Sequence, residues 1–369
     1  MRVGVPKEIK THEYRVGLIP ASVREMIHHG HEVVVETEAG LGIGFDDRDY
    51  ELAGARILAD ASAVFEAADM IVKVKEPQPS ECEMLREDQI LFTYLHLAAD
   101  RRQTEGLVAS GATAIAYETV TDAAGRLPLL APMSEVAGRM SIQVGAHCLE
   151  KRQGGSGVLL SGVPGVPVGR VVVIGGGVSG TNAARMAMGM EASVVVIDKN
   201  LSRLYELDMQ FGSTLNTIYS TVDSLEQYVT TADLVIGAVL VPGAAAPKII
   251  TRDMVRHMRP GSVIVDIAID QGGCAETSRP TSHDDPTYVE EGVVHYCVTN
   301  MPGAVARTST FGLNNATLPF ALALADKGLD AARSNPHLKN GVNVHKGKIV
   351  YEAVARDLGL DFSPVDEVL

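Results

Sequence analysis

The sequence predicts an α/β protein of two doubly wound, Rossmann-like domains with mostly parallel sheets, joined by two long helices around a cleft. Three observations favour this fold class. The chain has 369 residues, which is long for a single hydrophobic core. Short apolar runs alternate with helical patterns, as parallel strands with covering helices require. One apolar run leads into a glycine-rich turn at Gly175, which is typical of a dinucleotide-binding domain.

The segment Arg170–Asn200 carries the most specific pattern. Four apolar residues, 171–174, predict a strand buried on both faces. Gly175 to Gly180 then satisfy G-x-G-x-x-G, a helical pattern follows, and a second apolar run ends at Asp198. The glycines permit a tight turn and a close approach of a pyrophosphate, while the helix N-terminus offers N–H donors. A terminal carboxylate at this spacing accepts hydrogen bonds from a ribose.

The same segment indicates the cofactor. Asp198 favours NAD over NADP because a 2′-phosphate would meet a carboxylate, although Lys199 and Arg203 weaken that preference. The alternative is a glycine turn that binds nothing. The strand, glycines, helix, second strand and acid occur in the expected order, which favours a dinucleotide site.

Composition excludes several classes of protein. With 32 basic and 46 acidic residues the net charge is -14, which argues against a nucleic-acid or membrane-surface role. No apolar run reaches the roughly 20 residues that span a bilayer, and the first residues lack a signal-peptide core. The 4 cysteines show no C-x-x-C spacing. We therefore expect a cytoplasmic enzyme without a disulfide framework or a zinc site.

The first third of the chain is the expected home of the substrate. It alternates strand and helix patterns, but Pro6-Lys7-Glu8 stands where a glycine fingerprint would follow the first strand. The predicted strands are residues 3–5, 32–36, 70–75, 90–95 and 113–116.

Polar side chains end two of these strands. Lys75 ends one, and Tyr94 and His96 end another, where a period of two places them on the same side. A solvated lysine and a structural histidine are the ordinary alternatives. A cofactor domain needs a substrate beside it, which favours functional roles.

Two long helices are predicted to join the domains. The first begins near Ser134 and runs to about Arg152, with a small-residue face at Gly138, Ser141 and Gly145 that would admit another backbone. The second covers residues 310–327, and the tail after it predicts a hairpin at 343–350 and a final helix near 352–357. We expect a discontinuous substrate domain of residues 1–130 and 307–369, and an NAD-binding domain of residues 131–306.

The rest of the NAD-binding domain continues the alternation. Predicted strands at 234–240, 262–266 and 293–298 precede loops at 267–273 and 299–302. Loops at the carboxyl ends of parallel strands are the usual ligand-binding loops of such sheets.

Several long strings resemble bacterial alanine dehydrogenase, and the resemblance covers essentially the whole chain. They are MRVGVPKE, VKVKEP, ILFTYLHLAA, LPLLAPMSEVAGR, ADLVIGAVLVPGAAAPK, VDIAIDQGGC and Asn300-Met301-Pro302. The same superfamily contains the NAD-binding subunit of proton-pumping transhydrogenase and, more distantly, lysine- and saccharopine-forming dehydrogenases.

The resemblance implies reversible, NAD-dependent oxidative deamination of L-alanine to pyruvate and ammonium, by a homohexamer. It places acid/base catalysis at His96 and Asp270 and leaves the order of their roles open. The implied substrate-binding residues are Arg15, Lys75, Tyr94, Met133 and Asn300. The implied cofactor-binding residues are Ser134, Gly175, Gly177, Val178, Ser179, Gly180, Asp198, Arg203, Ser220, Val239, Leu240, Ile267, Asp270, Arg279, Val298, Asn300 and Met301.

Some relatives bind a divalent ion through a glutamate and a histidine. Glu118 matches the first position and Lys327 stands at the second, so no metal is predicted. Two alternative functions stay open. A transhydrogenase-type subunit would pass hydride to a membrane partner, and its apolar membrane-linked segments are not seen here. An opine-type or lysine-derived product would need a larger pocket.

Overall fold

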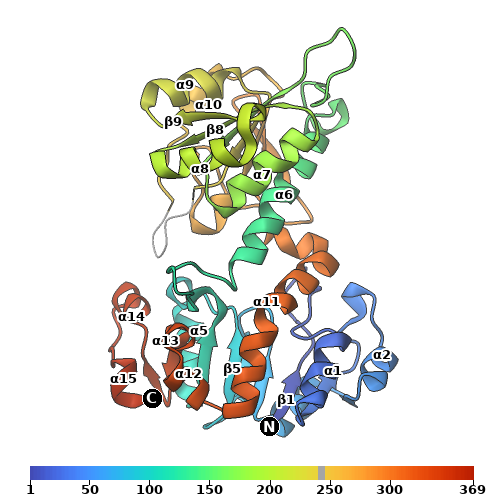
Figure 1. The fold of residues 1–369 in the computed structure, drawn as a ribbon, viewed down its shortest axis with the longest axis vertical. Coiled ribbons are helices and arrows are strands. Elements are labelled where there is room, and N and C mark those ends of the chain that lie inside the picture. The colour runs from blue at the N-terminus through green and yellow to red at the C-terminus, as the bar shows by residue number, and fades with distance from the viewer. Residues whose placement is uncertain (240–245) are drawn as a thin grey trace. The chain divides into compact units, whose positions relative to one another are not determined.

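The computed structural model describes residues 1–239 and 246–369, so Leu240, a predicted cofactor residue, lies outside the described residues. The chain divides into two compact units (Figure 1). Unit 1 comprises Met1–Met133 and Val305–Leu369, and unit 2 comprises Ser134–Ala304. Each unit has its own mostly parallel sheet with covering helices, which confirms the predicted α/β class.

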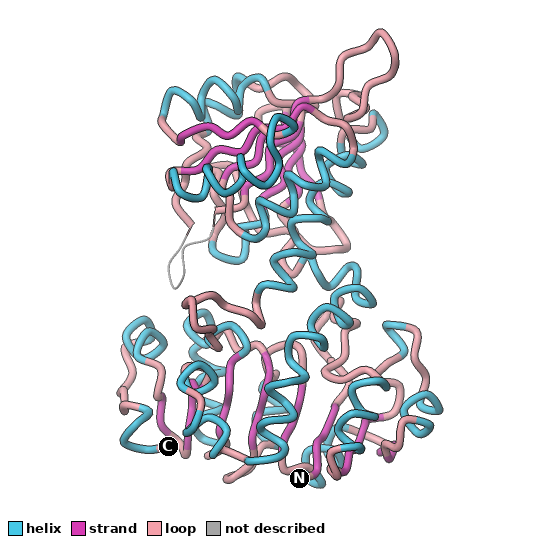
Figure 2. Tube along the Cα trace, viewed as in Figure 1, coloured by secondary structure: helices cyan, strands magenta, loops and turns pink. Residues whose placement is uncertain are grey.

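The sheet of unit 1 has the strand order β15-β14-β6-β5-β4-β1-β2-β3. Strands β1 to β6 are parallel, whereas β14 pairs antiparallel with β6 and with β15. Figure 2 shows these strands side by side. Their bounds are β1 (Arg2–Val5), β2 (Glu32–Glu36), β3 (Arg56–Leu58), β4 (Met70–Val72), β5 (Ile90–Thr93), β6 (Thr113–Ala116), β14 (Val342–His345) and β15 (Lys348–Ile349).

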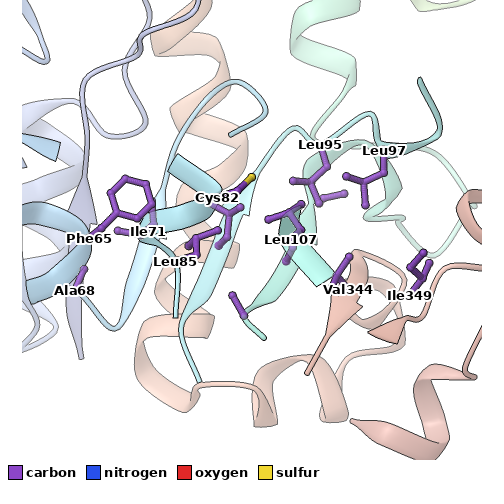
Figure 3. Packing of buried hydrophobic residues seen from close by; sticks show 14 of the residues in the cluster. Phe65, Ala68, Ile71, Cys82, Leu85, Leu95, Leu97, Leu107, Val344 and Ile349 are labelled. Atoms are coloured by element: carbon purple, nitrogen blue, oxygen red, sulfur yellow. The ribbon is translucent and has the colours of Figure 1, made fainter. Parts of the chain in front are cut away.

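Helices of unit 1 cover this sheet. Phe65 and Leu107, on two of the helices, pack with Ile71, Leu91 and Val344 of the sheet in one buried apolar cluster (Figure 3). The cluster therefore ties the end of the chain to its beginning. The helices are α1 (Pro20–His28), α2 (Asp47–Leu52), α3 (Ala61–Ala67), α4 (Pro79–Met84), α5 (Arg101–Ser110), α11 (Ala306–Lys327), α12 (Asp330–Ser334), α13 (Pro336–Lys339), α14 (Glu352–Leu358) and α15 (Val365–Val368).

The sheet of unit 2 has the order β12-β13-β11-β10-β7-β8-β9, and only the edge strand β12 is antiparallel among its described strands. Helices α9 and α10 cover one face, and α7 and α8 lie on the other (Figure 1). The strands are β7 (Arg170–Ile174), β8 (Ser193–Asp198), β9 (Asn216–Tyr219), β10 (Leu234–Gly237), β11 (Val263–Asp266), β12 (Thr287–Glu290) and β13 (Val293–Tyr296). The helices are α6 (Ala131–Cys148), α7 (Val178–Gly189), α8 (Leu201–Phe211), α9 (Val222–Thr231) and α10 (Arg252–His257).

The small-residue face of α6 packs as predicted. A Cβ at Gly138 would lie 2.1 Å from the carbonyl oxygen of Ser179, and one at Gly145 would lie 2.7 Å from Leu234. Any side chain with a Cβ would clash at these distances. The two glycines therefore let α6 approach the first turn of α7 and the strand β10.

Four strands end earlier than their apolar runs predict. β4 ends at Val72 rather than Lys75, and β5 ends at Thr93 rather than Leu95. β10 ends at Gly237, and β13 ends at Tyr296 rather than Val298. Beyond the first two strands a glutamate accepts from backbone N–H groups, as described below.

Three strands were not predicted at all. They are β3, β9 and β12, and each lies at an edge of its sheet. Edge strands have one unpaired side, and these three are only partly buried, so their sequences lack long apolar runs. Within the described ranges, no helix combines the length and apolar character needed to cross a membrane.

Candidate active site

The residues predicted to bind substrate in unit 1 lie close to one another. Lys75 follows β4, and Tyr94 and His96 follow β5, its parallel neighbour in the sheet. Arg15 lies in the loop after β1 and contacts Met133 near the start of α6. Ligand sites of parallel sheets form at this carboxyl edge.

Arg15 is a buried cation held by Glu13. Its Nε donates to Oε1 at 2.6 Å, and its Nη2 donates to Oε2 at 2.5 Å. Its Nη1 lies 3.1 Å from the sulfur of Met133. Burial would lower the pKa of Arg15, but the hydrogen bonds and the charge of Glu13 outweigh burial, so the pKa is raised. The guanidinium therefore stays charged, and its bidentate edge is already used within the protein.

The backbone at Lys75 is held on both sides. The N–H groups of Val74 and Lys75 donate to Oε1 of Glu8 at 2.7 and 3.2 Å. The carbonyl oxygen of Lys75 accepts from Oγ1 of Thr93 at 2.9 Å. Glu8 is thus the acceptor for these two N–H groups, which lie beyond the end of β4 at Val72.

A second lysine lies beneath this turn and was not predicted. Lys73 is fully buried, and its Nζ lies 3.1 Å from Oε2 of Glu8 and 2.6 Å from Oε1 of Glu81. Burial would lower the pKa of Lys73, but the two carboxylates outweigh burial and raise it. A lysine inside an apolar run is a signal in the sequence, but its partner Glu8 is 65 residues away.

Tyr94 and His96 stack on each other, although both lie beyond the end of β5 rather than on one face of a strand as the period of two predicts. Their ring centroids lie 5.8 Å apart with an interplanar angle of 6°. The hydroxyl of Tyr94 donates to the carbonyl oxygen of Leu129 at 2.6 Å. Burial raises the pKa of Tyr94 above its ordinary value, so the phenol stays neutral and keeps this hydrogen bond.

His96 owes its position to Glu118 rather than to a strand. Oε1 of Glu118 accepts from the N–H of His96 at 2.6 Å, and both carboxylate oxygens accept from the N–H of Leu95 at 3.2 Å. These bonds lie beyond the end of β5, and His96 is in the left-handed region, at φ 50°. The imidazole Nδ1 lies 3.9 Å from Oε1 of Glu118, and 46% of the side chain is exposed. Such an imidazole can exchange protons with a ligand.

Glu118 therefore fixes the backbone that carries His96. Among the residues that the structure describes, no three His, Cys, Asp or Glu side chains are grouped so that they could hold a metal.

The glycine turn of unit 2 has room for a ligand at one position and none at two others. A Cβ at Gly180 would lie 1.8 Å from the carbonyl oxygen of Gly175, and Gly175 itself has φ 100°. A Cβ at Gly177 would meet no described atom within 4 Å. Gly177 is also the N-cap of α7, and no side chain of a described residue caps that helix. The first N–H groups of α7, at Val178 and Ser179, therefore fit a pyrophosphate.

Asp198 ends β8 and is tied to this turn. Its Oδ2 accepts from the N–H of Gly176 at 2.6 Å, and its Oδ1 accepts from the N–H of Asn200 at 2.8 Å. A carboxylate oxygen can accept a second hydrogen bond, so the group still fits a ribose hydroxyl.

Arg203 is held beside the same turn. Its Nε donates to the carbonyl oxygen of Gly176 at 2.6 Å, and its Nη1 pairs with Glu206 at 2.5 Å. An arginine engaged in this way is a weaker attractor for a 2′-phosphate, which supports the preference for NAD.

Asp270 lies in an exposed position within a short 3-10 segment, Ile267–Gln271, after β11. The buried carboxylate of Asp266 organises this loop. Its oxygens accept from the N–H of Cys274 at 2.8 Å and from the hydroxyl of Ser278 at 2.6 Å. Asp266 was not predicted, because an aspartate at the end of a buried strand gives no indication of its own bonds.

Most of the other predicted cofactor residues also follow the carboxyl ends of parallel strands of unit 2. Ser134 and Arg279 are the exceptions. The guanidinium of Arg279 lies 3.9 Å from the ring centroid of Tyr288. The members that follow β9, β10, β11 and β13 are Ser220, Val239, Ile267, Val298, Asn300 and Met301.

Comparisons with known proteins cover both units of the chain. Residues 4–137 match the family model described as alanine dehydrogenase/PNT, N-terminal domain, and residues 141–352 match the corresponding C-terminal domain. The chain is 61% identical over 363 residues to the alanine dehydrogenase of Halomonas elongata, covering 98% of each protein.

Solved structures show the same fold. An L-alanine dehydrogenase superposes with a TM-score of 0.95 at 53% identity, covering 97% of this chain and 99% of that one. A transhydrogenase from Sinorhizobium meliloti superposes with a TM-score of 0.82 at 25% identity, covering 96% and 100%.

Proposed function

This chain belongs to the alanine dehydrogenase/PNT family, and we propose that it catalyses the reversible, NAD-dependent oxidative deamination of L-alanine to pyruvate and ammonium. The observation that carries the proposal is the grouping of Arg15, Lys75 and His96 at one edge of unit 1. Two fixed cations and an exposed imidazole are what a small 2-oxo acid and its amine require. Identity of 53–61% over nearly full length to proteins named alanine dehydrogenase supports the same reaction.

The substrate carboxylate is proposed to bind Arg15, and its carbonyl to bind Lys75. Because the Nε–Nη2 edge of Arg15 holds Glu13, the substrate would be gripped from the Nη1 side, where Met133 lies. Tyr94 and Asn300 complete the proposed binding set.

Proton transfer is assigned to His96 and Asp270. Hydride can leave Cα of alanine only after the amine loses its proton, so the reaction needs a base. Water then adds to the resulting iminium, and the carbinolamine expels ammonia, and each step moves one proton. Both side chains are exposed in this chain, so water can reach them.

NAD supplies the hydride acceptor. We propose that unit 2 is the NAD-binding domain and unit 1 the substrate domain. The N–H groups at the start of α7 would hold the pyrophosphate, and Asp198 the ribose. The remaining cofactor contacts are proposed at Arg203, Ser220, Val239, Leu240, Ile267, Arg279, Val298, Asn300 and Met301, with Ser134 at the start of the unit.

We also propose a cytoplasmic homohexamer. All 4 cysteines are free and buried, which fits a reducing compartment. The hexamer rests on the family resemblance. Light scattering coupled to size-exclusion chromatography tests it, and a monomer would refute it.

The function itself is tested with a panel of L-amino acids. Protein, NAD and each amino acid are mixed at alkaline pH, and NADH absorbance is followed. We expect a rise with alanine, and the reverse reaction should require both pyruvate and ammonium. NADH binding without turnover across the panel would refute the dehydrogenase and favour a transhydrogenase-type subunit.

A further inference from the structure

Glu8 is a buried carboxylate that contacts the turn carrying Lys75. It comes from the loop after β1, and only 8% of it is exposed. Its Oε1 accepts from two successive N–H groups, those of Val74 and Lys75. Two backbone donors on one oxygen fix the direction of the chain at that point, because both N–H vectors must converge on it.

The other oxygen of Glu8 is fixed as well. Its Oε2 pairs with Nζ of Lys73 at 3.1 Å, and the same Nζ lies 2.6 Å from Oε1 of Glu81. All three side chains are buried, so the carboxylate has little freedom to follow Lys75 if that residue moves. The ion-pair cluster therefore acts as a rigid support.

The opposite side of the same residue is tied to β5. The carbonyl oxygen of Lys75 accepts from Thr93, and the N–H of Tyr94 donates to the carbonyl oxygen of Val74 at 3.2 Å. Glu8 and β5 thus hold the peptides before and after the Cα of Lys75, and only its side-chain torsions remain to be set. Its Nζ lies 3.6 Å from Oε2 of the neighbouring Glu76.

We propose that Glu8 is a positioning residue of this enzyme: its carboxylate, anchored by Lys73, fixes the backbone of residues 74 and 75 and so directs the ammonium of Lys75 at the substrate. The inference rests on the proposed function, in which Lys75 binds the substrate carbonyl. Small displacements of such a group are costly, because the cation must meet the carbonyl oxygen as charge develops on it.

Glu81 offers a matched control. It belongs to the same buried cluster and pairs with the same Lys73, but its second oxygen accepts from the N–H of Gln78 at 2.8 Å. Neither of these two bonds involves the backbone of residues 74 and 75. Glu81→Gln and Glu8→Gln therefore remove the same charge from the same cluster, and only the second disturbs the support of Lys75.

The experiment compares Glu8→Ala, Glu8→Gln and Glu81→Gln with the wild-type enzyme. In Glu8→Ala we expect kcat/KM for pyruvate to fall about 100-fold while KM for NADH is unchanged. In Glu8→Gln, kcat/KM for pyruvate should fall less than in Glu8→Ala. The amide keeps one acceptor oxygen, which can serve one of the two sets of donors. Glu81→Gln should keep the wild-type value even if its melting temperature falls.

A second readout does not depend on turnover. Lysine labelling with trinitrobenzenesulfonate, followed by mass spectrometry of the Lys75 peptide, should be faster in Glu8→Ala and unchanged in Glu81→Gln. Wild-type kcat/KM in a folded Glu8→Ala variant, or an equal loss in Glu81→Gln, would overturn the proposal. If Glu8→Ala does not fold, the two glutamine variants decide. If the wild-type protein does not oxidise alanine, the proposed function fails, and the labelling rates still decide whether Glu8 holds Lys75.

Discussion

The two candidate ligand sites of this protein are built from different materials. In unit 1, charged side chains lie in the interior: Arg15 pairs with Glu13, and Lys73 pairs with two glutamates. In unit 2, the turn at Gly175–Gly180 offers backbone N–H groups and empty space. One site presents cations held by ion pairs, and the other presents a helix N-terminus.

The difference shows what each site must do. A cofactor pyrophosphate is large and is recognised by backbone groups that one short segment can supply. A three-carbon substrate offers only a carboxylate and a carbonyl, so side chains from several strands must be aimed at it with fixed torsions. Buried charges serve this purpose because moving them is costly.

The largest effect is expected from His96→Ala. Removing a general acid/base lowers turnover about 100- to 10,000-fold. The binding of NADH, followed by its fluorescence, should persist, because the groups that fit the cofactor lie in unit 2. Turnover close to that of the wild type would remove His96 from the proposed mechanism.

A large loss of stability is expected from Lys73→Met. It leaves Glu8 and Glu81 buried beside an apolar side chain, and breaking a buried pair in this way costs about 3–5 kcal/mol. Urea denaturation gives the free energy of unfolding. Combining Lys73→Met with Glu8→Gln and Glu81→Gln should restore part of it. If the single variant were as stable as the wild type, the cluster would have no structural role.

A smaller effect is expected from Gly177→Ala. Its backbone, at φ -67° and ψ -164°, suits alanine, and the new methyl group would meet no described atom within 4 Å. The fold should be kept, whereas KM for NAD should rise about 10-fold, or about 1.4 kcal/mol, because the methyl group occupies the space of the pyrophosphate. Gly189→Ala, at the other end of α7, is the control and should leave KM unchanged. An unchanged KM in Gly177→Ala would contradict the assigned cofactor site.

The smallest effect is expected from Asp326→Asn, far from either site in sequence. Hydrogen bonding to His31, and the charge of His29, lower the pKa of this exposed carboxyl. A carboxyl whose pKa is lowered by folding stabilises the protein at pH values above its unfolded-state pKa. That contribution is lost as the pH falls through the folded-state pKa. The melting temperature of the variant should therefore lie slightly below that of the wild type near about pH 6, and the gap should close toward about pH 3. A gap that widened on acidification would contradict this sign.

Much of the fold and part of the site could be predicted from the sequence. Buried parallel strands produce unbroken apolar runs, so most central strands were predicted and the edge strands β3, β9 and β12 were missed. Lys75 and His96 were predicted to be functional because the apolar runs placed them at strand ends, where ligands bind. The strands nevertheless end sooner, and beyond them Glu8 accepts from the N–H groups of residues 74 and 75, and Glu118 from those of residues 95 and 96.

By itself, the sequence determined the two α/β units and the glycine turn, because each arises from residues that are neighbours in the chain. Only the tertiary structure decided how the charged groups of unit 1 are held. Glu8 and Lys73 are 65 residues apart, and Glu118 and His96 are 22 apart. A carboxylate has no preferred partner until folding excludes water and leaves one donor within reach, so such pairs are set by the packing of distant segments rather than by any local pattern.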